Sequence, residues 1–346
     1  MPRTRMVWWD GVMTDVLILG GTGWLSGRVA RAWTDAGASV TCLARGGRPA
    51  PEGTELIVAD RAEPGAYEDV AAREWDEVVE ISSIPEFVAA AVDVLAERTR
   101  HWTYVSSLSV YATNDEVGAD ESAPLSEPAR AGDEYDYSRA KAAAEASVRA
   151  ALGDRAAIVR PGLIVGPGDP TDRFGYWVAR LALAGEEDVL APTLAGLTTQ
   201  VIDVDDLTDF LVRCGAEEWH GTANAIGDPM PLAELLSVAA ETAGHTGGIV
   251  DVDDSWLTGH AVKHWMGPRS LPLWLPRDMV GFSTRSNAAY RAAGGRISGI
   301  RGTLERTLAD ERARGLDRAR ASGLTRAEEL ALLAELTTWR RLAPST

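Results

Sequence analysis

Residues 16–29 read VLILGGTGWLSGRV: an apolar run, a glycine cluster and then the start of an amphipathic stretch. A strand, a glycine turn and a helix in this order are typical of the phosphate-binding corner of a dinucleotide-binding fold. Gly20 would allow the tight turn, and Gly23 would let a pyrophosphate approach backbone N–H groups at a helix N-terminus. The third small residue falls on Ser26, followed by Gly27, and we interpret this irregularity as a tolerated variant.

Short β-like runs alternate with helical runs through the first 165 residues. This alternation predicts an α/β fold with a doubly wound parallel sheet of the Rossmann type. We expect strands at 16–20, 39–44, 55–59, 77–82, 101–106 and 156–160. We expect helices at 27–36, 64–72, 85–98 and 138–152, the last of them after an acidic loop at 114–133.

The second half of the chain is less regular. It reads as strand then helix at 200–216, a strand at 222–226, a helix at 232–243 and a charged helical region from 302 onward. We therefore predict a Rossmann domain at 14–165 with a returning portion near 196–226. A smaller, mostly helical substrate-binding part at 166–195 and 227–346 would be interleaved with it. Residues 1–13 form an N-terminal extension in this interpretation, and Met13 could be the native start.

The composition excludes several classes of partner. With 34 basic and 51 acidic side chains the net charge is −17, which disfavours binding to nucleic acids or anionic membranes. No apolar stretch approaches the roughly 20 residues that span a bilayer, and the N-terminus lacks the apolar core of a signal peptide. We expect a cytoplasmic monomer or homodimer that binds a small molecule. Cys42 and Cys214 are expected to be buried reduced thiols, and the five histidines show no metal-ligand spacing.

A tyrosine and a lysine four residues apart begin the alanine-rich helix. Tyr137 and Lys141 would share one face of that helix, with phenol and ammonium pointing the same way. A phenol with a pKa of about 10 is a poor base, and a nearby ammonium would lower that pKa. Tyr137 could then exchange a proton with a carbonyl or alcohol while a nicotinamide carries the hydride.

Serines follow the fifth expected strand, in the segment VSSLSVY at 105–111. Ser106, Ser107 and Ser109 lie where ligands bind in open parallel sheets, beyond the carboxyl ends of the strands. A serine at this place could hydrogen-bond a reacting oxygen. Each of these features alone is more often structural. The glycine turn, the serines and the Tyr/Lys pair, in this order within one βαβ series, predict a hydride-transfer site.

The chain resembles the extended short-chain dehydrogenase/reductases of the NAD-dependent epimerase/dehydratase type. The matching features are GGTGWLSG, Asp60, VSSLSVY, the Tyr137/Lys141 pair and RPGLIVGPGD at 160–169. The resemblance implies that Ser107 and Tyr137 are catalytic and that Lys141 also binds the nicotinamide ribose. It implies cofactor contacts from Gly20, Thr22, Gly23, Trp24, Leu25, Asp60, Arg61, Ile81, Ser82, Ser83, Tyr137, Lys141, Pro161, Gly162 and Ile164.

The end of the second expected strand bears on the choice of cofactor. An NAD-preferring site usually has an acidic residue about 20 positions beyond the glycines. Here Ala44 and Arg45 occupy that region, and a guanidinium suits a 2′-phosphate. We therefore expect NADP to be preferred over NAD. Alternatively, Arg45 stacks on the adenine, which either cofactor allows.

The type of reaction stays open at this level. Dehydratases of this family place Asp-Glu after the catalytic threonine, whereas Leu108 and Ser109 stand here, so dehydration is disfavoured. We expect an NAD(P)-dependent oxidoreductase acting on a carbonyl/alcohol pair. The alternatives are a sugar-nucleotide epimerase acting by transient oxidation and a non-catalytic NADP-sensing or RNA-binding member. Substrate contacts are expected from the tryptophan-rich region 256–285 and from the segment that contains Arg173, Phe174, Tyr176 and Trp177. Arg173 and Arg269 could bind a phosphate or a carboxylate of the substrate.

Overall fold

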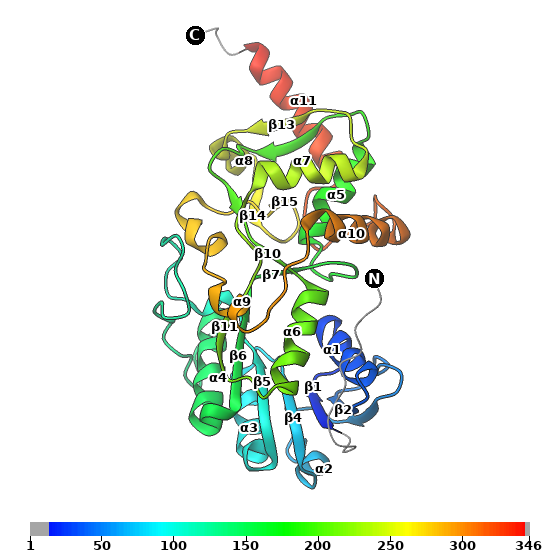
Figure 1. Ribbon diagram of the computed structural model, residues 1–346. Coiled ribbons are helices and arrows are strands. Elements are labelled where there is room, and N and C mark those ends of the chain that lie inside the picture. The colour runs from blue at the N-terminus through cyan, green and yellow to red at the C-terminus, as the bar shows by residue number, and fades with distance from the viewer. Residues whose placement is uncertain (1–13, 343–346) are drawn as a thin grey trace.

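A seven-stranded parallel sheet forms one half of the molecule (Figure 1). The computed structural model describes residues 14–342, so the expected extension at 1–13, with Met13, lies outside the described residues. The strand order is β11-β6-β5-β4-β1-β2-β3, which confirms the predicted doubly wound Rossmann fold. The strands are β1 (Asp15–Leu19), β2 (Ser39–Ala44), β3 (Glu55–Val58), β4 (Trp75–Glu80), β5 (Thr99–Val105), β6 (Ala156–Pro161) and β11 (Gly221–Ala225).

Side chains of successive strand residues point to opposite faces and build two separate cores. In β1, Val16 and Ile18 pack on one face with residues of α1 (Trp24–Asp35) and α6 (Val204–Ala216). Leu17 and Leu19 pack on the other face with residues of α3 (Pro85–Leu95) and α4 (Tyr137–Leu152). Because both faces of the sheet are covered by helices, most strand residues are buried, including the polar side chains of Glu77, Glu80 and His101.

The connections of the sheet divide at β1, which pairs with β2 on one side and with β4 on the other. Chain segments that leave the carboxyl ends of β1 and β4 therefore run to opposite sides. Such a switch point opens a crevice at the carboxyl edge of the sheet, where ligands bind in folds of this type.

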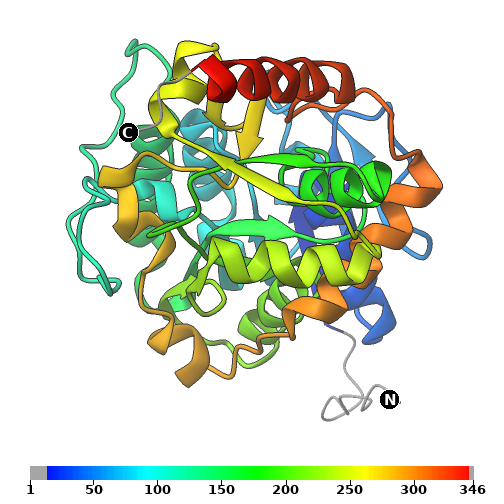
Figure 2. The same ribbon diagram turned by 90° about the horizontal axis from the view of Figure 1, so that it is seen from above.

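A third core lies in the other half of the molecule, beyond this edge (Figures 1 and 2). The chain enters this half through β7 (Leu163–Val165) and runs back to the sheet through β10 (Val201–Asp203), and these two strands pair in parallel. The other elements that contribute residues to this core are α5 (Arg173–Ala184), β8 (Val189–Pro192), α7 (Leu232–Ala243), β13 (Ile249–Val252), α8 (Asp254–Gly259), β14 (Lys263–Trp265), β15 (Ser270–Pro272), α10 (Ile300–Arg314) and α11 (Arg326–Leu342).

Several helix boundaries differ from the sequence-based expectation, including the end of α3, which stops at Leu95 instead of residue 98. Helix α1 begins at Trp24 rather than at residue 27, because Gly23 already serves as its N-cap. The helix expected at 64–72 shrinks to α2 (Glu68–Ala71), since Gly65 adopts a positive φ of 81° that ends any regular helix there. Helix α4 begins at Tyr137, one residue earlier than expected, because the carboxylate of Asp136 accepts a hydrogen bond from the Arg139 N–H.

The described residues 14–342 contain no helix that is both long enough and apolar enough to cross a bilayer. In the same range, no group of three or more His, Cys, Asp or Glu side chains is arranged to hold a metal ion. Cys42 and Cys214 are both buried and unpaired, as the sequence predicts.

The glycine turn packs directly on β2. A Cβ added to Gly21 would lie 2.3 Å from Sγ of Cys42 and 2.7 Å from its Cβ, far inside normal contact distance. A Cβ added to Gly27 would meet its nearest atom, the Gly21 carbonyl oxygen, at an ordinary 3.7 Å. The position that must stay small for steric reasons is therefore Gly21, which the spacing of the glycine pattern does not single out.

We expect Gly21→Ala to lower the free energy of unfolding by about 1–3 kcal/mol, because the methyl group overpacks against the buried Cys42. The double variant Gly21→Ala/Cys42→Ala should recover part of this loss, because it removes the clash with Sγ but keeps the Cβ of residue 42, which lies 2.7 Å from the added methyl group. Gly27→Ala is the matched control, and it should be neutral or stabilising by up to about 1 kcal/mol because it removes a helix-interior glycine. Urea unfolding measures all three variants, and a double variant as unstable as Gly21→Ala would contradict this packing.

Candidate active site

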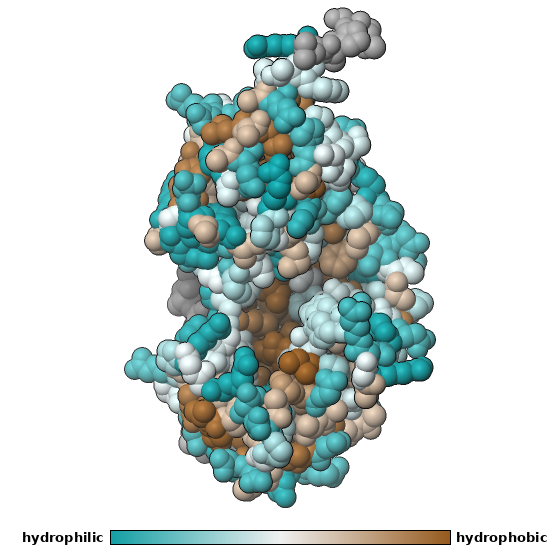
Figure 3. Space-filling view, turned by 180° about the vertical axis from the view of Figure 1, so that it is seen from behind, coloured by the Kyte–Doolittle hydropathy of each residue, from teal (hydrophilic) through white to brown (hydrophobic). Residues whose placement is uncertain are grey.

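A groove at the carboxyl edge of the sheet consists of two adjoining cavities that share Ile81. The first, of about 660 Å³, contains Ser107, Tyr137 and Lys141 in its wall. The second, of about 600 Å³, contains the glycine turn. Figure 3 shows, from behind, a hollow between the two halves of the molecule with hydrophobic residues on its floor. A long ligand with chemically distinct ends can therefore span both cavities.

The glycine turn is closed by Ser26 rather than by a third glycine. Gly20 adopts a φ of 90°, which L-residues rarely tolerate. The Ser26 hydroxyl donates to the Gly20 carbonyl oxygen at 2.6 Å and accepts from the Gly23 N–H at 2.9 Å. The Ser26 side chain thus stabilises the turn through two hydrogen bonds, in addition to being a small residue between helix and strand. The first-turn N–H groups of α1, which lack intrahelical partners, lie at this end of the helix and suit a phosphate.

Lys141 is held by the ends of two neighbouring strands. Its Nζ donates to the carbonyl oxygens of Ile81 at 3.2 Å, Ser82 at 2.9 Å and Val105 at 2.7 Å. Burial lowers the pKa of this ammonium to about 7, although the charges of Glu80 and Glu145 oppose the shift. The buried lysine is therefore positioned through its backbone contacts, at the floor of the first cavity.

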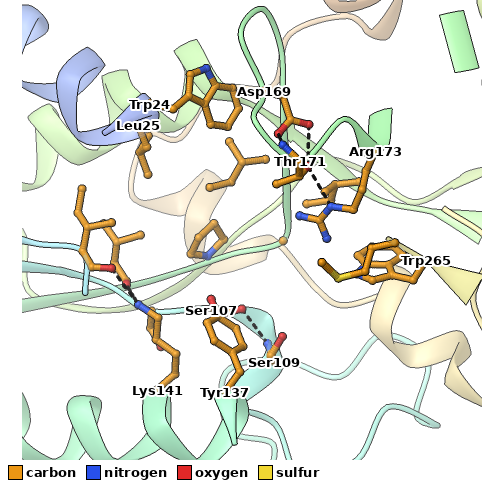
Figure 4. Close-up of a pocket in the computed structure, with 18 of the residues that line it drawn as sticks. Trp24, Leu25, Ser107, Ser109, Tyr137, Lys141, Asp169, Thr171, Arg173 and Trp265 are labelled. Carbon is orange, nitrogen blue, oxygen red and sulfur yellow. Dashed lines mark hydrogen bonds between the residues drawn. The ribbon is translucent and has the colours of Figure 1, made fainter. Parts of the chain in front are cut away.

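Tyr137 lies one helical turn before Lys141 and lines the same cavity, together with Ser107 (Figure 4). The Ser107 hydroxyl accepts a hydrogen bond from the Ser109 N–H at 3.1 Å, which fixes the serine side chain. Loss of contact with water raises the pKa of the Tyr137 phenol, while Ser107 and, more weakly, Arg173 lower it. This corrects the expectation that Lys141 lowers this pKa: the ammonium is directed at three carbonyls, and the phenol stays protonated at neutral pH.

Two arginines border the second cavity at the end of β2. Arg45 and Arg48 line it together with Gly20, Thr22 and Gly23. Both arginines are exposed, and neither forms an ion pair within residues 14–342. Asp60 lines the same cavity, and one of its carboxylate oxygens accepts from the Ala62 N–H at 3.0 Å.

Arg61 also lines the second cavity, but most of its donors are used by the protein. Its guanidinium forms a buried ion pair with Glu80, a side chain with no exposed surface, and donates to the Phe87 carbonyl oxygen at 2.8 Å. The Glu80 carboxylate in turn accepts from the Ser82 N–H at 2.7 Å. Since the Ser82 carbonyl holds Lys141, this pair supports the turn on which the lysine depends.

The expected substrate residues separate into two groups. Arg173 lines the first cavity, beside Trp265 of the tryptophan-rich region. Phe174, Tyr176 and Trp177 are at most 1% exposed and pack in the core of the second half, so the structure does not place them at the cavity. Arg269 lies outside both cavities and bonds to the His260 carbonyl oxygen and to Glu328. The three aromatic residues turn away because helix α5 directs neighbouring residues to different sides, whereas Arg269 lies in the turn before β15 and is held by its own partners.

Most of the residues expected at the cofactor line one cavity or the other. Ser83 lines neither, because its hydroxyl accepts from that of Tyr135 at 3.2 Å. The glycine turn, Arg45, Asp60, Arg61 and Ser82 lie in the second cavity. Those in the first cavity are Trp24, Leu25, Tyr137, Lys141, Pro161, Gly162 and Ile164, and Ile81 belongs to both. Sequence reasoning did not single out the wall residues Arg48, Asp169 and Thr171, although the acidic and hydroxyl residues shortly before Arg173 carried a readable signal. Met266 and Phe282, also in the wall, lie in the tryptophan-rich region from which substrate contacts were expected.

A family model described as "NAD dependent epimerase/dehydratase family" matches residues 16–227, which contain the sheet and most of the groove. The chain belongs to this family. The curated 2′-dehydrokanamycin reductase of Streptomyces kanamyceticus is 32% identical over 253 residues, which are 70% of either chain. The family therefore consists of NAD(P)-dependent enzymes that include both reductases and epimerases, and this chain is one of them.

Solved structures of family enzymes share the fold at low identity. UDP-glucose 4-epimerase of Thermotoga maritima with UDP-glucose has a TM-score of 0.64 at 13% identity, over 87% of this chain and 99% of that chain. The Bordetella bronchiseptica enzyme WbmG in complex with NAD and UDP has a TM-score of 0.63 at 14% identity, over 88% and 97%. These similarities show the fold of the chain.

We expect Arg61→Met to lower the free energy of unfolding by about 3–5 kcal/mol, because it leaves the Glu80 carboxylate buried without its counter-charge. Arg61→Met/Glu80→Gln should recover most of this loss, since the glutamine keeps an acceptor for the Ser82 N–H and carries no charge. Urea unfolding measures both variants. A double variant that is no more stable than the single one would show that the ion pair is not the supporting interaction.

Proposed function

We propose that this protein is an NADP(H)-dependent reductase that converts a ketone or aldehyde group of a small molecule to an alcohol. The observation that carries the proposal is that Ser107, Tyr137 and Lys141 line one cavity, which joins the cavity of the glycine turn at Ile81. This arrangement supports the proposal, because the phenol of Tyr137 would then stand next to the nicotinamide end of a bound dinucleotide. The name of the curated relative supports reduction as the direction.

In the proposed reaction, three polar side chains of the first cavity would each have a separate role. The bound cofactor would supply the hydride for the carbonyl carbon. Tyr137 would donate its phenolic proton to the carbonyl oxygen, and the raised pKa of this phenol favours the protonated form that such a donor needs. The Ser107 hydroxyl, fixed by the Ser109 N–H, would hydrogen-bond the same oxygen. Lys141, at the floor of the cavity, would exchange the longest of its carbonyl contacts, the one to Ile81, for a hydroxyl of the cofactor ribose and so orient it.

We expect Tyr137→Phe to retain NADPH binding and to lower the rate of NADPH oxidation about 100-fold or more, because the variant lacks the proton donor. Tyr135→Phe is the matched control: this neighbouring tyrosine is 62% exposed and bonds to Ser83, so its variant should keep the activity. A panel of carbonyl compounds with NADPH absorbance as readout measures the rates, and fluorescence titration measures binding. Failure of the wild type to bind any dinucleotide would overturn the proposal.

The preference for NADP rests on Arg45 and Arg48. Both flank the second cavity without an ion-pair partner in the described part of the chain, and no carboxylate replaces them at the end of β2. A guanidinium binds a 2′-phosphate through charge-assisted hydrogen bonds, whereas a 2′-hydroxyl gains far less from it.

We expect Arg45→Ala to raise the dissociation constant of NADPH about 10-fold or more, with little effect on NADH. Arg31→Ala is the charge-matched control, because Arg31 is exposed on α1 and lines neither cavity. Titration of both cofactors against both variants gives the result. Equal affinities for NADPH and NADH in the wild type, unchanged in Arg45→Ala, would remove this arginine from the cofactor site.

A further inference from the structure

We propose that the substrate carries an anionic oxygen group, a carboxylate or a phosphate, which binds the guanidinium of Arg173. The inference rests on the proposed function, because Arg173 lies in the wall of the cavity that contains Tyr137 and Ser107. It assigns a charge and a binding chemistry to a substrate whose reacting group is a carbonyl.

A chain of three side chains orients the guanidinium from behind. Nε of Arg173 donates to the Thr171 hydroxyl oxygen at 3.1 Å, and the Thr171 hydroxyl donates to Oδ2 of Asp169 at 2.9 Å. The other Asp169 oxygen accepts from the Thr171 N–H at 2.8 Å. Asp169 is only 4% exposed, so this chain is anchored in the protein interior. Figure 4 shows the three residues in line above the cavity.

The terminal amino groups of Arg173 are left for a ligand. Within residues 14–342 they make no hydrogen bond or ion pair with the protein, while the guanidinium lies 5.0 Å from the ring centroid of Trp265. The guanidinium points into the cavity, on the side where Tyr137 and Ser107 face it (Figure 4). An arginine fixed through Nε and an aromatic ring presents its two terminal nitrogens as a fork, which matches the two oxygens of a carboxylate or phosphate.

No acidic side chain in the described part of the molecule competes for this fork. The carboxylate of Asp172, the next residue toward the N-terminus, is turned away and bound by Arg318 and Arg314. The carboxylate of Asp169 is already used by Thr171. Burial lowers the pKa of Arg173, and the charge of Asp169 and the phenol of Tyr137 oppose this shift only in part, so an anionic ligand at the terminal amino groups would favour the charged guanidinium.

The other basic group in the wall of this cavity, Lys141, does not offer an equivalent site. The Lys141 ammonium is saturated by three carbonyl oxygens. Apolar residues of the cavity wall include Met266, Phe282 and Trp265, and the Trp265 ring lies against the Arg173 guanidinium. The cavity is therefore suited to a compound with an apolar body, a carbonyl group near Tyr137 and an anionic group that reaches Arg173.

Four ligands that share a phenyl ring test the proposal: phenylacetate, phenyl phosphate, phenylacetamide and phenethylamine. We expect the better anion to bind the NADPH-loaded protein about 10-fold or more tightly than the neutral amide, and the amine to bind most weakly. The more tightly bound anion identifies the group as carboxylate or phosphate. Arg173→Gln should abolish the preference, and Arg301→Gln, an exposed arginine paired with Glu241, should retain it.

A positioning variant separates orientation from charge. Thr171→Val keeps Arg173 but removes the hydroxyl that holds its Nε, so the anion preference should fall several-fold while the affinity for the amide stays the same. Equal affinity for all four ligands, a preference unchanged in Arg173→Gln, or tightest binding of the amine would each overturn the proposal. Calorimetry repeats the comparison of the four ligands on the cofactor-free protein. A protein that fails to bind NADPH contradicts the proposed function, and this outcome is thereby distinguished from the absence of an anion site.

Discussion

The site depends on the burial of one ammonium group between two strand ends. Three carbonyl oxygens, from the residues that follow β4 and from the last residue of β5, receive the donors of Lys141. A buried ammonium without such partners would cost several kcal/mol, so these bonds tie α4 to the edge of the sheet. One turn further along, Glu145 forms an ion pair with Arg160 of β6. Tyr137, Lys141 and Glu145 share one face of α4. The contacts of Lys141 and Glu145 therefore fix the position of Tyr137 in the site.

The order of strands and helices could be predicted from the sequence, because apolar runs and glycine turns report local preferences. The glycine turn, Ser107, Tyr137 and Lys141 belong to this order, and the parallel sheet then brings its carboxyl ends together without further information. The resemblance to the family, and not the local pattern, led to the expectation of Ile81, Ser82 and Pro161 at the cofactor, and these residues line the groove.

Features that depend on contacts between distant segments could not be predicted. Arg61 and Glu80 are 19 residues apart, and no local pattern shows that their side chains meet in the interior. Gly21 is required because of Cys42 on the adjacent strand, which is also a tertiary contact. Phe174, Tyr176 and Trp177 follow Arg173 on α5, and only the packing of that helix decides that the arginine faces the cavity while the aromatic rings fill a core.

The contact between Cys42 and Gly21 makes the glycine turn accessible to a simple chemical readout. Burial raises the pKa of the Cys42 thiol, and the thiolate is the form that reacts with alkylating agents. Labelling of this thiol therefore requires that β2 and the turn separate for a moment. The labelling rate measures how often the turn opens, and a ligand that binds the closed turn slows it. Cys214, which lies buried on α6, provides an internal reference for opening elsewhere in the fold.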